Sequence, residues 1–280
     1  MLGVKKDKFK KYLLFTITTL VAAIWLLPLI WMLSTSLKPE ADTISWPIKF
    51  IPENFTLDNY KAIFSNSERT PMLRWFFNSI FIATTTTVLV VFFDALAAYA
   101  YARMEFKGRK IMFMTLMATM MIPPVTNLIP NYIIVDKLGW LDSYSAMIFP
   151  AIANVFGVFL LRQFFMGIPK ELEEAAFIDG CTRFQVFRMI ILPLAKPALI
   201  TLSLFTFLGS WNAFLWPLIV TNSAEMKPLT PGLSLLQGYY VIEFGKLMAG
   251  ALISALPVII LFLFVQRYFV QGISLTGTKG

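Results

Sequence analysis

Six stretches of this sequence are each long and apolar enough to cross a lipid bilayer, and no other feature limits the possible folds as much. A helical span needs about 20 residues at a rise of roughly 1.5 Å per residue. Because 58% of the 280 residues are hydrophobic and only 14% are charged, the composition excludes a soluble domain of this length. The sequence therefore predicts an all-α polytopic membrane protein with six transmembrane helices, at residues 12–33, 75–101, 111–135, 146–166, 197–220 and 247–269.

Charges at the borders of these segments predict their orientation. Lysines at residues 5–11 precede the first segment, whose apolar run exceeds the roughly 7–15 residues of a signal peptide and is followed by no A-x-A cleavage site. An even number of spans places both termini on one side. Most of the 24 basic residues then lie in cytoplasmic segments, as the positive-inside rule requires. We therefore expect a basic cytoplasmic N-terminus (1–11), a six-helix domain (12–269) with a cytoplasmic loop (168–193), and a cytoplasmic tail (270–280).

Several function classes are excluded by composition. The chain has no histidine and a single cysteine, Cys181, so zinc sites, Cys–His catalysis and internal disulfides are not expected. We expect no metal site and no catalytic residues. The phosphate-binding pattern GxxxxGK[ST] is absent, so any ATP must be bound by another chain. The basic residues are spread along membrane borders, which argues against nucleic-acid binding as the origin of the net charge of +8.

A charged segment, ELEEAAFIDGCTRFQVFRMIILP at residues 171–193, interrupts the apolar pattern between the fourth and fifth spans. Pro169 is typical of the first position of a helix, and the glutamates that follow it favour the positive helix end. Gly180 is typical of the left-handed residue that ends a helix. Thr182 and Gln185 have the spacing of a capping box. These signals predict two short helices that meet near Gly180, the second with one apolar face made of Phe184, Phe187 and Ile191.

Asp94 is a carboxylate within the second predicted span, about nine residues or roughly 14 Å from the border at Arg103. An ionisable residue at that depth marks a functional site by default. Two interpretations remain open. Asp94 is either a proton-coupling group or a structural residue that faces a partner subunit.

Polar residues within the spans suggest a substrate pathway. Trp211 and Asn212 in the fifth span offer the aromatic face and the amide that suit a sugar. The alternative is that aromatic residues such as Trp216 belong to an interfacial belt, and that Asn212 bonds a neighbouring helix. Three further candidates of the same kind are Asn127, Asn131 and Asn154.

The charged segment resembles the EAA loop of permease subunits in ATP-binding cassette importers. The resemblance rests on Glu174-Ala175-Ala176, Asp179-Gly180, Phe187 and Ile191-Leu192-Pro193, and the chain is most similar to the MalG-like branch of carbohydrate importers. We name residues 168–193 the EAA loop. The stretches around Arg103, at Trp211-Asn212 and at residues 272–280 support the same resemblance.

The resemblance implies a type I importer permease fold and a specific set of partners. These are a second, MalF-like permease, two ATPase subunits that hold ATP and Mg, an extracytoplasmic solute-binding protein, a carbohydrate substrate and membrane lipid. It implies a bacterial or archaeal plasma (inner) membrane and no cofactor bound by this chain. It also implies ATPase-coupling roles for Leu172, Glu174, Ala175, Ala176, Asp179, Gly180, Thr276 and Gly277.

The predicted function is therefore that of a transmembrane permease subunit in an ATP-driven sugar importer, without enzymatic activity of its own. A proton-coupled secondary carrier that uses Asp94 is the alternative, although we find no inverted repeat with matching broken helices. A membrane sensor or scaffold is a third class, but it would not require polar residues along its spans.

Overall fold

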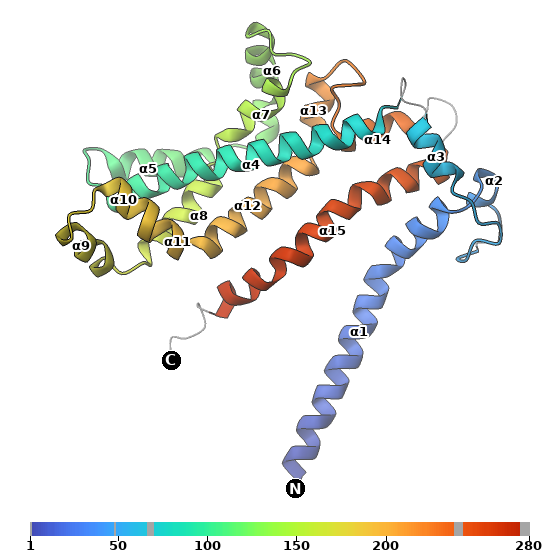
Figure 1. Ribbon diagram of the computed structural model, residues 1–280, viewed down its shortest axis with the longest axis horizontal. Coiled ribbons are helices and arrows are strands. Elements are labelled where there is room, and N and C mark those ends of the chain that lie inside the picture. The colour runs from blue at the N-terminus through green and yellow to red at the C-terminus, as the bar shows by residue number, and fades with distance from the viewer. Residues whose placement is uncertain (1, 48, 66–69, 238–242, 275–280) are drawn as a thin grey trace. The chain divides into compact units, whose positions relative to one another are not determined.

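The computed structural model describes residues 2–47, 49–65, 70–237 and 243–274, and this part of the chain contains helices and no strand (Figure 1). The elements are α1 (Leu2–Ser36), α2 (Glu40–Thr43), α3 (Asp58–Ser65), α4 (Met72–Arg103), α5 (Arg109–Thr119), η1 (Pro124–Asn127), α6 (Leu128–Lys137), α7 (Tyr144–Ile152), α8 (Val155–Met166), α9 (Glu171–Ile178), α10 (Arg183–Val186), η2 (Phe187–Ile191), α11 (Leu192–Leu194), α12 (Lys196–Trp211), α13 (Leu215–Val220), α14 (Leu229–Ser234), η3 (Leu235–Gln237) and α15 (Phe244–Ser274).

The predicted all-α membrane fold is confirmed, and the spans are of two kinds. Three single helices are long and apolar enough to cross a bilayer: Lys10–Ser36 of α1, all of α4, and Phe244–Gln266 of α15. Three bent helix pairs pass the same test, with breaks of 94° between Arg109–Thr119 and Pro124–Lys137, 42° between α7 and α8, and 77° between Arg183–Leu194 and α12. Counting each bent pair as one span gives six, the predicted number.

The sequence predicted continuous helices where the structure has bent pairs, and at one break the cause is local. Pro123 and Pro124 lie at the 94° break, where proline supplies no N–H to continue an α-helix. The fifth predicted span, residues 197–220, is divided between α12 and α13. Residues in α10 to α11, which the sequence placed in a cytoplasmic loop, form part of the bent pair with α12.

The chain divides into two compact units, Met1–Thr70 with Leu233–Leu256, and Pro71–Gly232 with Pro257–Gly280. In the first unit the Glu40 carboxylate accepts hydrogen bonds from the N–H groups of Phe244 (2.7 Å) and Gly245 (3.0 Å), where the start of α15 favours negative charge. The amide of Asn59 donates to the Ser36 and Lys38 carbonyls at 2.9 and 2.8 Å. The six-helix domain predicted at residues 12–269 thus spans both units.

In the second unit, α4 packs against α8, α12 and α7. One apolar core lies where α4 ends, and α9 and α10 lie at this same end of α4 (Figure 1). A second core includes Ile82 of α4, Met147 of α7 and Val220 of α13. Helix α4 therefore contributes to both cores, the one beside the predicted coupling residues and the one beside the predicted pathway residues.

Candidate coupling loop and candidate substrate cavity

The EAA loop contains the two short helices that the sequence predicted. Gly180 has φ +85°, the left-handed conformation expected where α9 ends. The Thr182 side chain accepts a hydrogen bond from the Gln185 N–H, and the Gln185 side chain accepts one from the Thr182 N–H at 2.7 Å, which completes the capping box. Helix α9 begins at Glu171 with Lys170 at its N-cap, so Pro169 precedes the helix rather than occupying its first position.

Helix α9 turns one narrow face into the protein, and this face holds Glu173 and Ala176. Ala176 packs in the apolar core with Tyr99 of α4, Leu161 and Phe165 of α8, and Phe187 of η2. The rings of Tyr99 and Phe187 lie 5.0 Å apart between centroids. Phe187 and Ile191 are buried as expected, but Phe184 is 64% exposed, so the predicted apolar face of the second helix is only partly covered.

A buried ion pair joins α9 to the end of α4. Arg103 Nε lies 2.5 Å from Glu173 Oε1, and each side chain is 7% exposed. Arg103 also donates through Nη2 to the Ile168 carbonyl at 2.6 Å. Burial raises the pKa of the Glu173 carboxyl, and the Arg103 guanidinium beside it offsets only part of this shift.

Glu173 was not predicted as a site residue, whereas its neighbour Glu174 was. The signal available was the three-residue spacing of Glu173 and Ala176, which places both on one face of a helix.

The rest of the α9 surface is exposed and includes apolar side chains on either side of the buried face and opposite it. Leu172, Phe177 and Ile178 are 45%, 43% and 86% exposed. Four other predicted coupling residues lie exposed on this helix or just after it: Glu174, Ala175, Asp179 and Gly180. Ala176 differs from them because it is in the core, and Thr276 and Gly277 lie outside the described residues.

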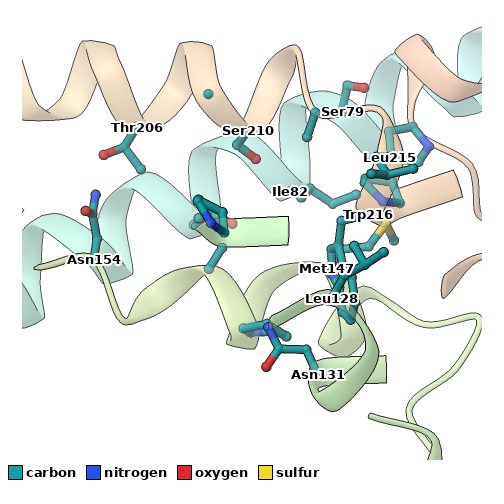
Figure 2. Close-up of a pocket in the computed structure, with 18 of the residues that line it drawn as sticks. Ser79, Ile82, Leu128, Asn131, Met147, Asn154, Thr206, Ser210, Leu215 and Trp216 are labelled. Carbon is teal, nitrogen blue, oxygen red and sulfur yellow. The ribbon is translucent and has the colours of Figure 1, made fainter. Parts of the chain in front are cut away.

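The second unit contains a cavity of about 560 Å³, within the range of small-molecule sites. Its serine, threonine and asparagine side chains come from four elements: Ser79 and Thr86 from α4, Asn131 from α6, Asn154 at the start of α8, and Thr206 and Ser210 from α12. Figure 2 labels all of these except Thr86. The Oγ1 atoms of Thr86 and Thr206 have no hydrogen-bond partner within the described residues. Buried hydroxyls normally find a partner, so these two atoms are unsatisfied polar groups in residues that line the cavity.

Two of the five predicted pathway residues, Asn131 and Asn154, line this cavity, while three do not. Trp211 is 1% exposed, and its ring stacks on Phe207 with centroids 5.8 Å apart. The Asn212 amide donates to the Leu208 carbonyl at 3.0 Å, and Asn127 precedes α6 at its N-cap. Trp216 does line the cavity, and its indole N–H donates to the Ala146 carbonyl at 2.9 Å.

Asp94 lies on α4 and is 3% exposed. It lies against the start of α8, since a Cβ on Gly157 would collide with the Asp94 carboxylate. It does not line the cavity of 560 Å³.

The segment that follows α13 is fixed to the rest of its unit by polar contacts. The Asp142 carboxylate accepts hydrogen bonds from the N–H groups of Asn222 (2.9 Å) and Ser223 (3.1 Å). Partial burial raises the pKa of Asp142, but the hydrogen bonds from Ser223 and Asn222 and the charge of Lys227 hold that pKa below its usual value overall. The segment 222–228, which reaches the cavity at Pro228, is thus fixed by hydrogen bonds to Asp142.

Known proteins are similar to this chain in sequence and in fold. Residues 95–275 match the family described as "Binding-protein-dependent transport system inner membrane component". The chain is 38% identical to the arabinooligosaccharides transport system permease protein AraQ of Bacillus subtilis over 263 residues, 93% of each chain. It is 33% identical to the trehalose/maltose transport system permease protein MalG of Thermococcus litoralis over 282 residues, 99% of each chain.

A solved structure of an ABC transporter is similar to this chain in fold. The crystal structure of a bacterial ABC transporter involved in the import of the acidic polysaccharide alginate matches with a TM-score of 0.78 and 26% identity, over 94% of this chain and 98% of that one. Members of this family are the membrane component of such importers and are not the ATPase. The chain therefore belongs to the family of inner membrane components of binding-protein-dependent transport systems, among the permeases of sugar ABC importers.

Proposed function

We propose that this chain is one of two permeases in an ATP-driven importer of oligosaccharides, and that its EAA loop transmits the movement of the ATPase subunits to the spans. The observation that carries the proposal is the two-sided structure of α9. One face is fixed to α4 through Glu173 and Ala176, and the remaining surface exposes Leu172, Phe177 and Ile178. Exposed apolar side chains on a helix that is itself firmly docked are typical of a protein–protein contact.

The proposed partners follow from this arrangement and from the family. Two ATPase subunits bind ATP and Mg, and one of them receives α9, with Glu174 facing a basic group. A second permease completes the pathway, and an extracytoplasmic solute-binding protein contacts the surface near residues 221–246. In this proposal both termini and the EAA loop lie in the cytoplasm, and the six spans lie in the plasma membrane. The tail with Thr276 and Gly277 is proposed to lie near the ATPase.

The proposed substrate pathway uses the cavity of 560 Å³. Asn131 and Asn154 supply polar groups, while Trp216 and Phe156 supply apolar surface. Sugars present both kinds of surface, since ring faces are apolar and hydroxyls need partners. The relatives named for arabinooligosaccharides and for trehalose/maltose support neutral oligosaccharides as the first substrates to test.

The test is transport by the whole complex in proteoliposomes. Radiolabelled arabinotriose and maltotriose should enter vesicles only when ATP, the ATPase subunits, both permeases and the solute-binding protein are all present. The alternative of a proton-coupled carrier differs in its energy source. Uptake driven by an imposed pH gradient without ATP, and abolished by Asp94→Asn, would replace the proposed function with that alternative.

A further inference from the structure

Asp94 has the features of a ligand-binding group rather than of a satisfied structural residue. Its side chain is 3% exposed, and Oδ2 has no hydrogen-bond partner among the described residues. A carboxylate can only accept hydrogen bonds, and an unsatisfied one inside a membrane protein is costly. Asp94 also lines a cavity, where a ligand hydroxyl can donate to its carboxylate.

The break between α7 and α8 places a helix N-terminus beside this carboxylate. Helix α8 begins at Val155 after a 42° bend, and Asp94 lies against Gly157 in its first turn. The Asn154 side chain caps this end by accepting from the Gly157 N–H at 3.4 Å, and the helix dipole adds a partial positive charge there, which stabilises an anion. Broken helices that place such ends within the membrane are a feature of transporter binding sites.

A second cavity of about 480 Å³ opens next to Asp94. Its walls are Phe93 and Ala97 of α4, Leu116 of α5, and residues 149–158 around the break. Asn154 lines this cavity and also the cavity of 560 Å³. Along α4 the first cavity is lined at Ser79, Ile82 and Thr86, and the second at Phe93, Asp94 and Ala97.

The two cavities therefore lie one after the other along α4. From Thr86 to Asp94 the helix advances by eight residues, roughly 12 Å. That distance is comparable to the length of a short oligosaccharide, and Asn154 lines both cavities. In the predicted orientation α4 runs toward the cytoplasm from Met72 to Arg103, so the cavity beside Asp94 is the one nearer the cytoplasm, and we call it the inner cavity.

We propose that Asp94 and Asn154 form an inner sugar subsite that accepts neutral, hydroxyl-rich sugars and rejects acidic ones. This inference rests on the proposed function and adds a selectivity to it. Sugar hydroxyls donate to the carboxylate, and the apolar walls cover a ring face. A uronate or sulfonate group brings a negative charge and no donor, so Asp94 repels it. The likeness to an alginate importer does not extend to acidic cargo at this position.

The charge of the inner cavity is measurable in the assembled complex without knowledge of the natural substrate. Ala153 lines the cavity and is exposed, so Ala153→Cys in a Cys181→Ser background provides a thiol probe there. A positively and a negatively charged methanethiosulfonate are compared, each rate being divided by its rate with a free thiol in solution. The positive reagent should react roughly ten-fold faster, and Asp94→Asn should abolish this preference.

Thr87→Val is the matched control, because the Thr87 hydroxyl donates to the Ala83 carbonyl of its own helix at 2.6 Å. It should leave the reagent preference unchanged. Equal rates for the two reagents would overturn the proposal. Failure of both reagents to label would also overturn it, since a side chain of the second permease would then cover Asp94.

Selectivity is read from protection of the same thiol. Arabinotriose or maltotriose should slow labelling in the parent, whereas trigalacturonate should do so only in the Asp94→Asn variant. Protection by neither neutral sugar, or by the acidic sugar in the parent, would refute the subsite. Absence of ATP-dependent uptake by the parent would overturn the proposed function and the subsite together, whereas uptake without the charge preference would overturn the subsite alone.

Discussion

Glu173→Gln should loosen the EAA loop without affecting the insertion of the spans. The substitution keeps the size of the side chain and removes its charge, which leaves the Arg103 guanidinium buried without a counter-ion. Arg103 would retain only its hydrogen bond to the Ile168 carbonyl. Apolar length and flanking charge, which govern membrane insertion, do not change.

The magnitude follows from the burial of the pair. Removing one member of a buried ion pair costs about 3–5 kcal/mol. We expect the lower end, about 3 kcal/mol, because Ile168 still satisfies part of the guanidinium. Since about 1.4 kcal/mol is a factor of ten, local opening of the loop should become roughly 100-fold more frequent. Replacing both members by methionine should restore most of the docking, because paired apolar side chains of similar volume replace a buried ion pair at little cost.

Hydrogen–deuterium exchange of the assembled complex in lipid nanodiscs measures this opening. Peptides from residues 168–193 should lose protection in Glu173→Gln and regain it in the Arg103→Met/Glu173→Met double variant, while α8 peptides serve as an internal reference. Glu171→Gln is the matched control, because Glu171 is an exposed carboxylate on the same helix. Unchanged protection in Glu173→Gln, or a double variant as open as the single one, would refute the role of this pair in docking α9.

Three other outcomes test the coupling and the outer surface. Gly180→Val should lower both ATPase retention on purification and substrate-stimulated hydrolysis more than Glu174→Ala does. A β-branched residue does not tolerate φ +85°, whereas Glu174 is an exposed side chain whose removal leaves the backbone unchanged. Equal effects of the two substitutions in both assays would contradict this order. The pKa of Asp142 is lowered in the folded state, so its carboxylate stabilises the fold above the unfolded value near pH 4 and this contribution is lost as the pH falls through the lower folded value. Exchange protection of residues 222–228 should therefore be constant from pH 7 to about pH 5 in the parent and lower throughout in Asp142→Asn, and a loss of parental protection near pH 6 would contradict this assignment. The purified chain alone should hydrolyse no ATP, and activity should require the ATPase subunits.

Local sequence signals were sufficient for much of the architecture. Apolar length predicted the six spans, and the paired prolines at Pro123 and Pro124 lie where the third span is bent. Gly180 and the Thr182–Gln185 capping box were predicted because each depends on residues within one helical turn. The turn of π-helix at η2 was not predicted, although Pro193, which follows it closely, cannot donate the N–H that a regular α-helix uses.

The tertiary structure alone decided which polar residues act together. Arg103 and Glu173 are 70 positions apart, and only the packing of α9 against the end of α4 makes them a buried pair. Packing also buries Trp211, whereas Asn131 and Asn154 line the cavity. The sequence did not distinguish them, because each is a polar or aromatic residue within an apolar span. A helical sequence fixes which residues share a face, because that depends on a period of about 3.6 residues. It does not fix what the face meets, because that depends on contacts between helices distant in the chain.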